Sequence, residues 1–148
     1  MDAEPDLFYF HRPTAPHPVN VPVEFLTVQQ FLADEPACKV FWTLVDSQFR
    51  TRSKLLTIWP GVRFVALHRS ADGTADGFLL ITCPVNWQID YVVVHPNSRG
   101  QGIAQALVVE TLNRAFERKA PYVMLTSRES LRPMYESCGF TVVPGNGV

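Results

Sequence analysis

Apolar residues follow two spacings along this chain, and each spacing predicts a kind of secondary structure. Short runs of β-branched and aromatic residues, bounded by turn residues, predict strands at 21–26, 62–68, 77–83, 90–94, 122–126 and 140–143. Apolar residues that recur every three or four positions predict helices at 28–34, 36–49, 103–116 and 134–137. Consecutive strands imply antiparallel pairing, and the later succession of strand, helix and strand implies a parallel pair. The pattern therefore predicts an α/β fold, with a mixed central sheet and helices on both of its faces.

Residues 1–20 break this pattern and form an N-terminal arm before a single domain at 21–148. Prolines recur through the arm, so we do not expect it to form a helix. It nevertheless contains a run of apolar residues at 7–10, and such a run seldom lies in solvent. We expect these residues to pack against the domain as an added strand.

The stretch at 90–108 joins a strand, a glycine turn and the start of a helix without a gap. Gly100 and Gly102 flank Gln101, and the helical spacing of apolar residues begins at Ile103. The first amides of an α-helix lack partners within the helix, and the macrodipole adds about half a positive charge there. Glycines let a ligand approach such a backbone closely. The turn is therefore either a seat for a phosphate group or only a tight connection between strand and helix.

Composition and charge narrow the classes of partner. The chain has 148 residues, is 47% hydrophobic and carries a formal net charge of -1, which is typical of a globular protein. It has no basic stripe of the kind that binds nucleic acid. It has no apolar run of roughly 20 residues to span a membrane, and its first residues are acidic rather than basic as in a signal peptide. Its three cysteines lie far apart, without the spacing of a metal site. We therefore expect a cytoplasmic protein with no nucleic-acid, membrane or metal partner.

Two segments carry a family resemblance. The first, VHPNSRGQGIA at 94–104, resembles the acyl-CoA motif of the GNAT N-acetyltransferase superfamily, Arg/Gln-x-x-Gly-x-Gly/Ala. The second, MYESCGF at 134–140, resembles the other motif on the coenzyme A side of these proteins, a tyrosine on a short helix that ends in Gly-Phe. Both occur in the expected order and on the expected elements, so the resemblance covers residues 62–143. It implies a GNAT-like fold.

The resemblance implies a site for acetyl-CoA. The pyrophosphate would lie on the amides of the glycine turn, and the pantetheine arm would pair with the backbone of the central strand at Val92 and Val94. A backbone N–H of that strand would also stabilise the oxyanion of the transition state. The implied cofactor-binding residues are Val92, Val94, Arg99, Gly100, Gln101, Gly102, Ile103 and Ala104.

The resemblance also implies two catalytic roles. Tyr135 would act as general acid toward the departing coenzyme A thiolate, the alternative being a packing tyrosine on an amphipathic helix. Asp90, the only carboxylate in its strand, would act as the base, and its spacing predicts that it shares a face with Val92. An acid bonded to backbone at the sheet edge is an equal interpretation of Asp90. Glu24 and His95 are weaker candidates for the base.

The implied activity is transfer of an acetyl group from acetyl-CoA to a primary amine of a small molecule or a peptide. The transfer would be direct, in a ternary complex and without a covalent enzyme intermediate. A different class of function is also open, a non-catalytic acyl-CoA sensor or interaction module with the same fold. A dinucleotide site is disfavoured, because the acid expected about 20 residues after the glycines of such a site is replaced by Ser127 and Arg128.

The chain departs from the family in two ways. GNAT proteins commonly end in a pair of strands, whereas this chain has room for only one after Gly139. The missing strand is expected either from the N-terminal arm or from another subunit, as in a homodimer. Family members also often place an asparagine before the tyrosine helix, where this chain has SRES at 127–130.

The sequence gives the least information about the acceptor amine. The two early helices and the loop at 50–61 are expected to select it. Phe41, Trp42 and Trp59 either form an apolar wall for the acceptor or belong to the core.

Overall fold

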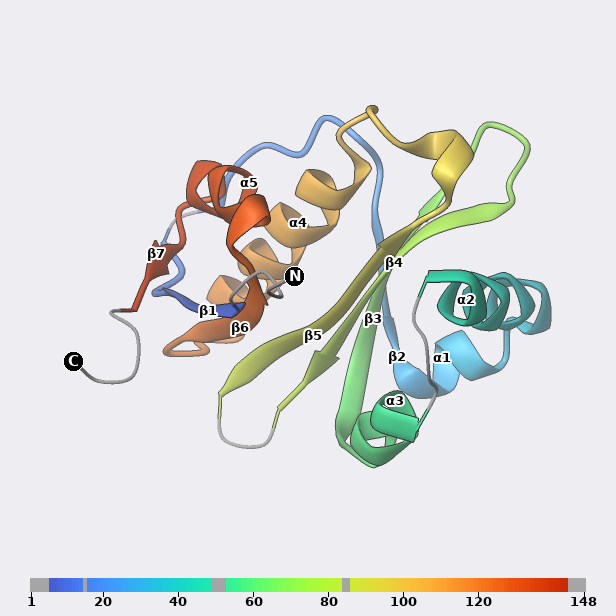
Figure 1. Cartoon of the computed structure of the whole chain (residues 1–148), viewed down its shortest axis with the longest axis horizontal. Coiled ribbons are helices and arrows are strands. Elements are labelled where there is room, and N and C mark those ends of the chain that lie inside the picture. The colour runs from blue at the N-terminus through green and yellow to red at the C-terminus, as the bar shows by residue number, and fades with distance from the viewer. Residues whose placement is uncertain (1–5, 15, 49–52, 84–85, 144–148) are drawn as a thin grey trace, which may run out of the picture.

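The computed structural model describes residues 6–14, 16–48, 53–83 and 86–143. It contains a seven-stranded sheet in the order β2-β3-β4-β5-β6-β1-β7, in which β5 and β6 are parallel and all other neighbours are antiparallel (Figure 1). The strands are β1 (Asp6–His11), β2 (Glu24–Thr27), β3 (Val62–Arg69), β4 (Ala75–Thr82), β5 (Trp87–Val94), β6 (Val123–Arg128) and β7 (Thr141–Val142). The helices are α1 (Val28–Leu32), α2 (Glu35–Gln48), α3 (Ser53–Ile58), α4 (Ile103–Glu117) and α5 (Arg132–Ser137). The predicted mixed sheet with helices on both faces is confirmed.

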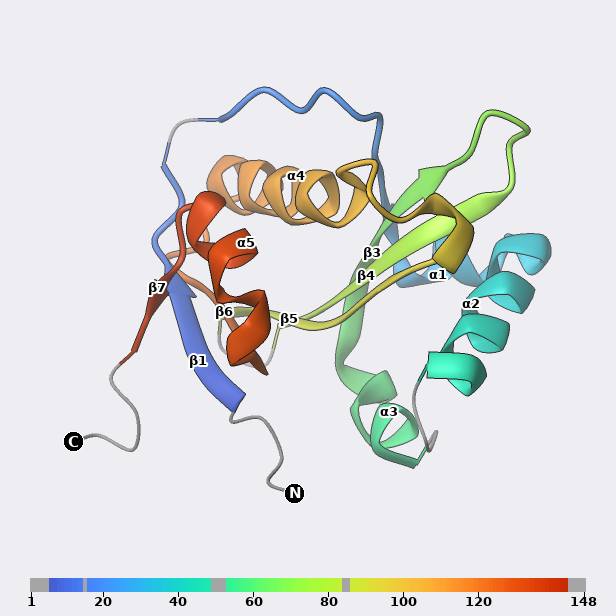
Figure 2. The same ribbon diagram turned by 45° about the horizontal axis from the view of Figure 1, so that its top comes forward.

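The N-terminal arm forms an internal strand of this sheet. β1 lies between β6 and β7, and Tyr9 pairs with Leu125 on one side and with Val142 on the other. Alternation along the strand sends Leu7 and Tyr9 into the core under α4 and α5, and Phe8 to the opposite face. Figure 2 shows β1 between the two later strands. The second closing strand that the family resemblance requires therefore comes from this chain's own N-terminal region, and the sheet does not need a second subunit to supply it.

The link from β1 to β2 is hydrogen-bonded to the outer face of α4. The backbone of His17 donates to Asn113 Oδ1 at 2.8 Å, and Asn113 Nδ2 donates back to the His17 carbonyl at 2.7 Å. Figure 2 shows this link crossing over α4 before the chain enters β2. These hydrogen bonds hold the link against α4 as it runs from β1, near one edge of the sheet, to β2 at the other edge.

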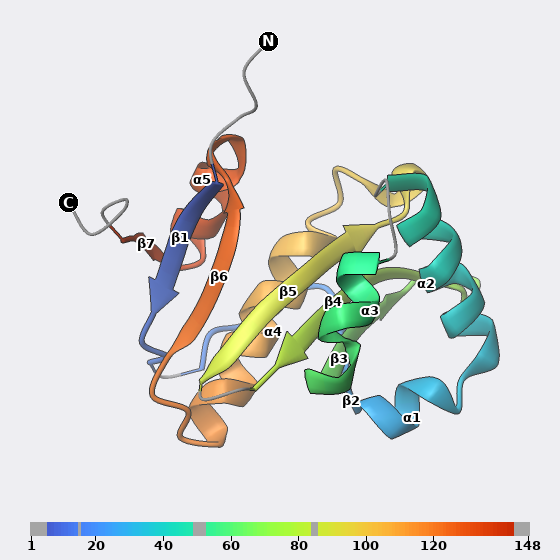
Figure 3. The ribbon, with the colours of Figure 1, turned by 60° about the horizontal axis from the view of Figure 1, so that its bottom comes forward.

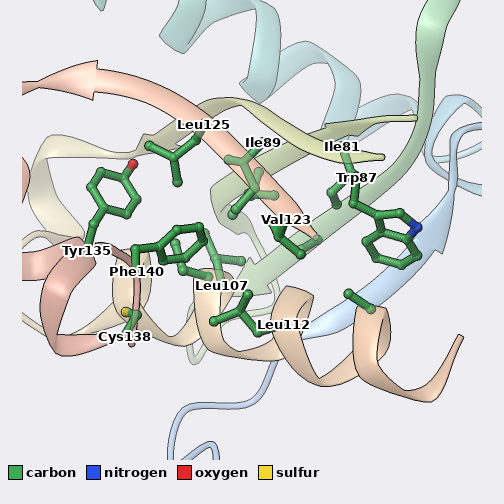
Figure 4. Close-up of a cluster of buried hydrophobic side chains, with 14 of the residues drawn as sticks. Ile81, Trp87, Ile89, Leu107, Leu112, Val123, Leu125, Tyr135, Cys138 and Phe140 are labelled. Atoms are coloured by element: carbon green, nitrogen blue, oxygen red, sulfur yellow. The ribbon is translucent and has the colours of Figure 1, made fainter. Parts of the chain in front are cut away.

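Two buried clusters hold the sheet, one on each face. On the α4 and α5 side, Leu107, Leu112 and Phe140 pack against apolar residues of the central strands (Figure 4). On the other side, Phe31 and Phe41 of α1 and α2 pack against β3 and β4. Burying each such side chain contributes about 1.5–3 kcal/mol. Helices α1 to α3 cover β2 to β5, and no described helix covers the face of β6 and β1 on that side (Figure 3).

Helix α4 begins directly on the sheet because β4 has a glycine beneath it. A Cβ added at Gly77 would lie 2.6 Å from Cγ2 of Ile103 and 3.4 Å from Cδ1 of Leu107. Only glycine therefore allows the first turn of α4 to pack this close to β4. The contact sets the helix start beside the ends of β4 and β5.

The parallel pair β5 and β6 separates after three paired positions. The register ends at Ile89 opposite Leu125, although both strands continue. Figure 3 shows the two strands together at one end and apart at the other. A gap therefore opens in the middle of the sheet, beside Asp90 and the residues that follow it.

A β-bulge lies at the point where the gap opens. On β4, Leu80 pairs with Tyr91 and Ile81 pairs with Ile89, so Asp90 is an extra residue without a partner. After the bulge, Val92 packs against the cluster under α4 and Tyr91 against the cluster under α2. The prediction that Asp90 shares a face with Val92 is wrong, because the bulge shifts the alternation by one residue.

The structure also differs from the sequence pattern at the ends of elements. The loop predicted at 50–61 contains α3 and a 3-10 helix at Trp59–Gly61, while Arg50 and Arg52 of that loop lie outside the described residues. β5 begins at Trp87 rather than at residue 90, because Trp87 and Ile89 continue its buried face. Within the described part of the chain, no helix is long and apolar enough to cross a membrane.

Candidate active site

A cavity of about 980 Å³ occupies the gap between β5 and β6. Its lining includes Leu125 and Ser127 on one face of β6 and Thr126 and Arg128 on the other. The cavity therefore passes through the sheet. One mouth lies beside α4 and α5, and the other lies beside Gln48 at the end of α2.

The turn between β5 and α4 forms the first wall. Gly100 and Gly102 have left-handed backbones, with φ of +81° and +76°, and a Cβ added at either would meet nothing within 4 Å. Gly102 is the N-cap of α4 and supplies no side chain to cap the helix. The amides of Ile103 and Ala104 therefore begin the helix at the edge of the cavity with space in front of them. This arrangement suits an anionic group.

The second part of this wall is the free edge of β5. The N–H of His95 donates to the carbonyl of Asp76 on β4, at 2.7 Å. Because N–H groups of successive strand residues point to alternate edges, those of Val92 and Val94 point away from β4 and toward the gap. The Val94 carbonyl on that edge accepts from Nε2 of Gln48, at 3.2 Å. The edge thus has the polarity needed to pair with an extended ligand.

Seven of the eight predicted cofactor-binding residues line this one cavity, and the eighth, Gln101, is exposed and is not part of the lining. The seven are Val92, Val94, Arg99, Gly100, Gly102, Ile103 and Ala104. Both predicted catalytic residues, Asp90 and Tyr135, line it as well. The structure therefore brings the two motifs together across the gap.

Tyr135 lies on the opposite wall, on α5, and is 4% exposed. Its ring centroid is 5.1 Å from that of Tyr9 and 5.9 Å from that of Phe140, which lies beside it in Figure 4. Its hydroxyl interacts with the side chain of Ser127. Burial raises the pKa of the Tyr135 phenol to about 12, and the Ser127 hydrogen bond opposes part of this rise. The phenol is therefore protonated at neutral pH and available as a hydrogen-bond donor.

Asp90 is half-buried in the bulge and accepts two hydrogen bonds from neutral donors. Oγ1 of Thr82 donates to Oδ2 at 2.5 Å, and Nε2 of Gln88 donates to Oδ1 at 2.9 Å. Among the residues that the structure describes, no cation forms an ion pair with Asp90. Its carboxylate therefore lines the cavity without an ion-pair partner among the described residues.

The other predicted candidates lie elsewhere. Glu24 on β2 is ion-paired with Arg69 at 2.6 Å, and His95 accepts the backbone N–H of Asn97 on Nδ1 at 3.1 Å. Neither is among the residues that line the cavity. Phe41 is buried in the cluster beneath α2, and the half-buried Trp42 and Trp59 pack against it; none of the three lines the cavity, which favours their interpretation as core.

Sequence reasoning missed several cavity residues. Asp6 of the arm lines the cavity, and Tyr9 of the arm packs behind Tyr135; the apolar run at 7–10 was the only signal for this segment. Ser127 and Arg128 were noted only for what they replace, the family's asparagine and the acid of a dinucleotide site. Gln48 ends α2 at the second mouth of the cavity, and its position within the helix gave no signal.

The sequence matches a known family over most of its length. The sequence model of the Acetyltransferase (GNAT) family matches residues 28–140. The chain belongs to the GNAT acetyltransferase family. The GNAT resemblance of the segments at 94–104 and 134–140 is thereby confirmed, and the mixed sheet is the GNAT fold. Among curated proteins, none matches the chain.

Solved structures of GNAT proteins share this fold at low sequence identity. A GNAT-family protein from Novosphingobium aromaticivorans is 18% identical, with a TM-score of 0.71 over 95% of this chain and 60% of that one. A protein named as an acetyltransferase from Deinococcus radiodurans is 17% identical, with a TM-score of 0.59 over 89% and 90% of the two chains. A GCN5-related N-acetyltransferase from Sphaerobacter thermophilus is 18% identical, with a TM-score of 0.56 over 93% of this chain and 48% of that one. This GNAT chain thus spans about half of the Sphaerobacter protein, and at such identities the likeness shows the fold alone.

Proposed function

We propose that this GNAT acetyltransferase moves an acetyl group from acetyl-CoA to a primary amine, directly and within a ternary complex. One observation carries the proposal: a single cavity joins the start of α4, the free edge of β5 and the hydroxyl of Tyr135. These are an anion seat, a strand-like partner for an extended arm and a hydrogen-bond donor, the three parts that an acyl-CoA donor requires.

The residues divide the reaction between the two faces of the sheet. The α4 amides bind the pyrophosphate, and the edge of β5 at Val92 and Val94 pairs with the pantetheine arm. One backbone N–H of this edge stabilises the oxyanion that forms as the amine attacks the thioester. Asp90 and Gln88 lie on the α2 side, so the amine enters from there. Asp90 takes the proton that the ammonium form must lose before attack.

The high pKa of Tyr135 decides how this residue acts. Complete proton transfer from a phenol with a pKa of about 12 to a thiolate with a pKa of about 8.5 is uphill by about 5 kcal/mol. A hydrogen bond from the phenol to the departing thiolate avoids this cost and is strong because the acceptor is charged. Tyr135 therefore stabilises the leaving thiolate, which takes its proton from solvent.

The test is release of free thiol from acetyl-CoA with a panel of primary amines that includes amino acids, small polyamines and peptides. Replacing Tyr135 by Phe is expected to lower kcat by about 10- to 100-fold with little change in KM for acetyl-CoA. Tyr122→Phe is the matched control, because Tyr122 packs on Phe10 away from the cavity. If the wild type binds acetyl-CoA but releases no thiol with any amine, the protein is a non-catalytic acyl-CoA sensor or interaction module instead.

Asp90→Asn tests the base separately. We expect kcat/KM for the amine to fall by about 100-fold or more, and the acidic limb of the pH-rate profile to disappear, because the amide cannot accept a proton. Asp72→Asn, in the exposed hairpin between β3 and β4, is the control. An unchanged pH-rate profile in Asp90→Asn would mean that this strand binds the cofactor without supplying the base.

A further inference from the structure

Helix α5 is too short to fix the hydroxyl of Tyr135 by itself. It spans only Arg132–Ser137, and its N-cap residue, Leu131, makes no side-chain capping hydrogen bond. A helix of this length is marginal on its own, so the direction of its side chains depends on the elements against which it packs. For Tyr135 those elements are β6 and β1.

Ser127 of β6 holds the hydroxyl end of Tyr135. It lies on the same face of the strand as Leu125, toward α5, lines the same cavity as Tyr135, and its side chain interacts with the phenol. It is only half-buried. Ser127 therefore lies beside the position that the leaving sulfur must occupy if Tyr135 is to reach it.

Tyr9 of β1 holds the ring of Tyr135. It is 1% exposed, and its ring centroid lies 5.1 Å from that of Tyr135. Its own hydroxyl donates to the carbonyl of Arg128 at 3.4 Å, next to Ser127. Because β1 is paired on both edges, this contact comes from a rigid part of the sheet.

We propose that Ser127 and Tyr9 are positioning residues that aim the Tyr135 hydroxyl at the leaving sulfur. A phenol has one hydrogen to donate and can also accept. When Ser127 donates to the phenol oxygen, the hydrogen of Tyr135 is left for the thiolate, and each hydrogen bond strengthens the other. Tyr9 prevents the ring from turning away. This inference rests on the proposed function and adds two residues to its machinery.

A double-mutant cycle tests the role of Ser127. In the chain with Tyr135, Ser127→Ala is expected to lower kcat by about tenfold, with KM for acetyl-CoA changed by less than about twofold. In the Tyr135→Phe background the same substitution is expected to have no further effect, because no hydroxyl remains to be aimed. Ser137→Ala is the matched control, since Ser137 is an exposed serine of α5 that is not among the residues lining the cavity. Equal losses in the two backgrounds would mean a merely structural role and would overturn the proposal.

The role of Tyr9 is tested by separating its ring from its hydroxyl. Tyr9→Phe keeps the ring and is expected to change kcat by less than about threefold. Tyr9→Leu removes the planar ring and is expected to lower kcat by about five- to tenfold when Tyr135 is present, with no further loss in Tyr135→Phe. Assays are run well below the melting temperature of the weakest variant. An equal loss in both backgrounds would exclude Tyr9 as a positioning residue.

A measurement with coenzyme A alone separates this inference from the proposed acetyl transfer. The ultraviolet absorbance of the thiolate gives the pKa of the thiol of bound coenzyme A without any acceptor. The wild type is expected to lower this pKa by stabilising the thiolate, and Ser127→Ala is expected to remove part of the shift only when Tyr135 is present. A shift that is unaffected by Ser127→Ala would overturn the inference even if acetyl transfer is observed. Absence of turnover together with the expected shift would leave the inference standing and remove the enzyme proposal.

Discussion

The two walls of the cavity are built in opposite ways. The wall formed by β5, the glycine turn and the first turn of α4 is one continuous stretch of chain. The wall formed by β6, α5 and β1 joins residues as far apart as Tyr9 and Arg128, which are 119 positions apart. The first wall carries the proposed cofactor contacts, and the second carries Tyr135. The proposed cofactor contacts are therefore local in the chain, whereas the position of Tyr135 depends on the N-terminal strand.

This difference predicts how each wall fails. A change in the glycine turn alters a few amides at a helix start and leaves the cores intact. A change in β1 removes contacts that both β6 and β7 need, because β1 lies between them. The two walls can therefore be separated by comparing stability with cofactor affinity.

The largest effect is expected from Tyr9→Ala. Removing this fully buried ring should lower the free energy of unfolding by about 3–5 kcal/mol, because it leaves a cavity between β1 and α5. Denaturant titration measures the loss. Phe8→Ala is the control, since Phe8 is the neighbouring residue on the open face and is 60% exposed, so it should cost less than about 1 kcal/mol. Similar losses for the two variants would show that the second wall does not depend on the buried face of β1.

A smaller effect is expected from alkaline pH acting on the second wall. The pKa of Tyr135 is raised from an ordinary value of 10.0 to about 12 in the folded protein. Below pH 10 both states keep the proton and nothing changes. Between pH 10 and 12 the unfolded chain loses the proton more readily, so stability should fall by about 3 kcal/mol in total from this residue.

Comparison with Tyr135→Phe isolates this contribution. The variant should lose less stability than the wild type as the pH rises from 10 to 12, measured by denaturant titration at each pH. Tyr122→Phe is the control, because Tyr122 is a half-buried tyrosine outside the cavity. This variant should lose as much stability as the wild type between pH 10 and pH 12. Parallel curves for Tyr135→Phe and the wild type would mean that Tyr135 ionises as freely in the folded protein as in the unfolded chain.

The smallest effect on stability is expected in the first wall. Gly102→Ala places a Cβ at φ of +76°, which should cost about 1–2 kcal/mol, and Gly73→Ala in the hairpin between β3 and β4 carries the same strain at φ of +87°. The two variants should therefore be equally destabilised. Only Gly102→Ala should also weaken acetyl-CoA binding, by about tenfold in calorimetric titration, because it moves the first amides of α4. Equal affinities would mean that these amides do not bind the pyrophosphate.

The same contrast explains what could be predicted from the sequence. The glycine turn was readable because its strand, its glycines and its helix start are adjacent in the chain and act through local backbone geometry. The orientation of Asp90 was not readable. It depends on a bulge, and a bulge is defined by the pairing of β5 with β4 rather than by the residues of β5 alone.

The second wall was predicted only in part. The motif at 134–140 identified Tyr135, and the apolar run at 7–10 indicated that the arm packs on the domain. Neither pattern specified that β1 enters the sheet between β6 and β7, because a strand carries no local signal for a partner more than 100 residues away. The contacts of Tyr135 with Tyr9 and Ser127 follow from that insertion and became visible only in the structure.

The antiparallel pair of β1 and β7 has a consequence for the chain order of this fold. The N–H of Val143, just after β7, donates to the carbonyl of Phe8 at 2.9 Å. The two strands therefore pair like the strands of a β-hairpin, but no turn connects them. A turn built there, with new ends opened in the link that crosses α4, would be a circular permutation that keeps every strand in its present place. In such a chain β1 would follow β7 directly, as the last strand instead of the first, and would keep the same two neighbours in the sheet.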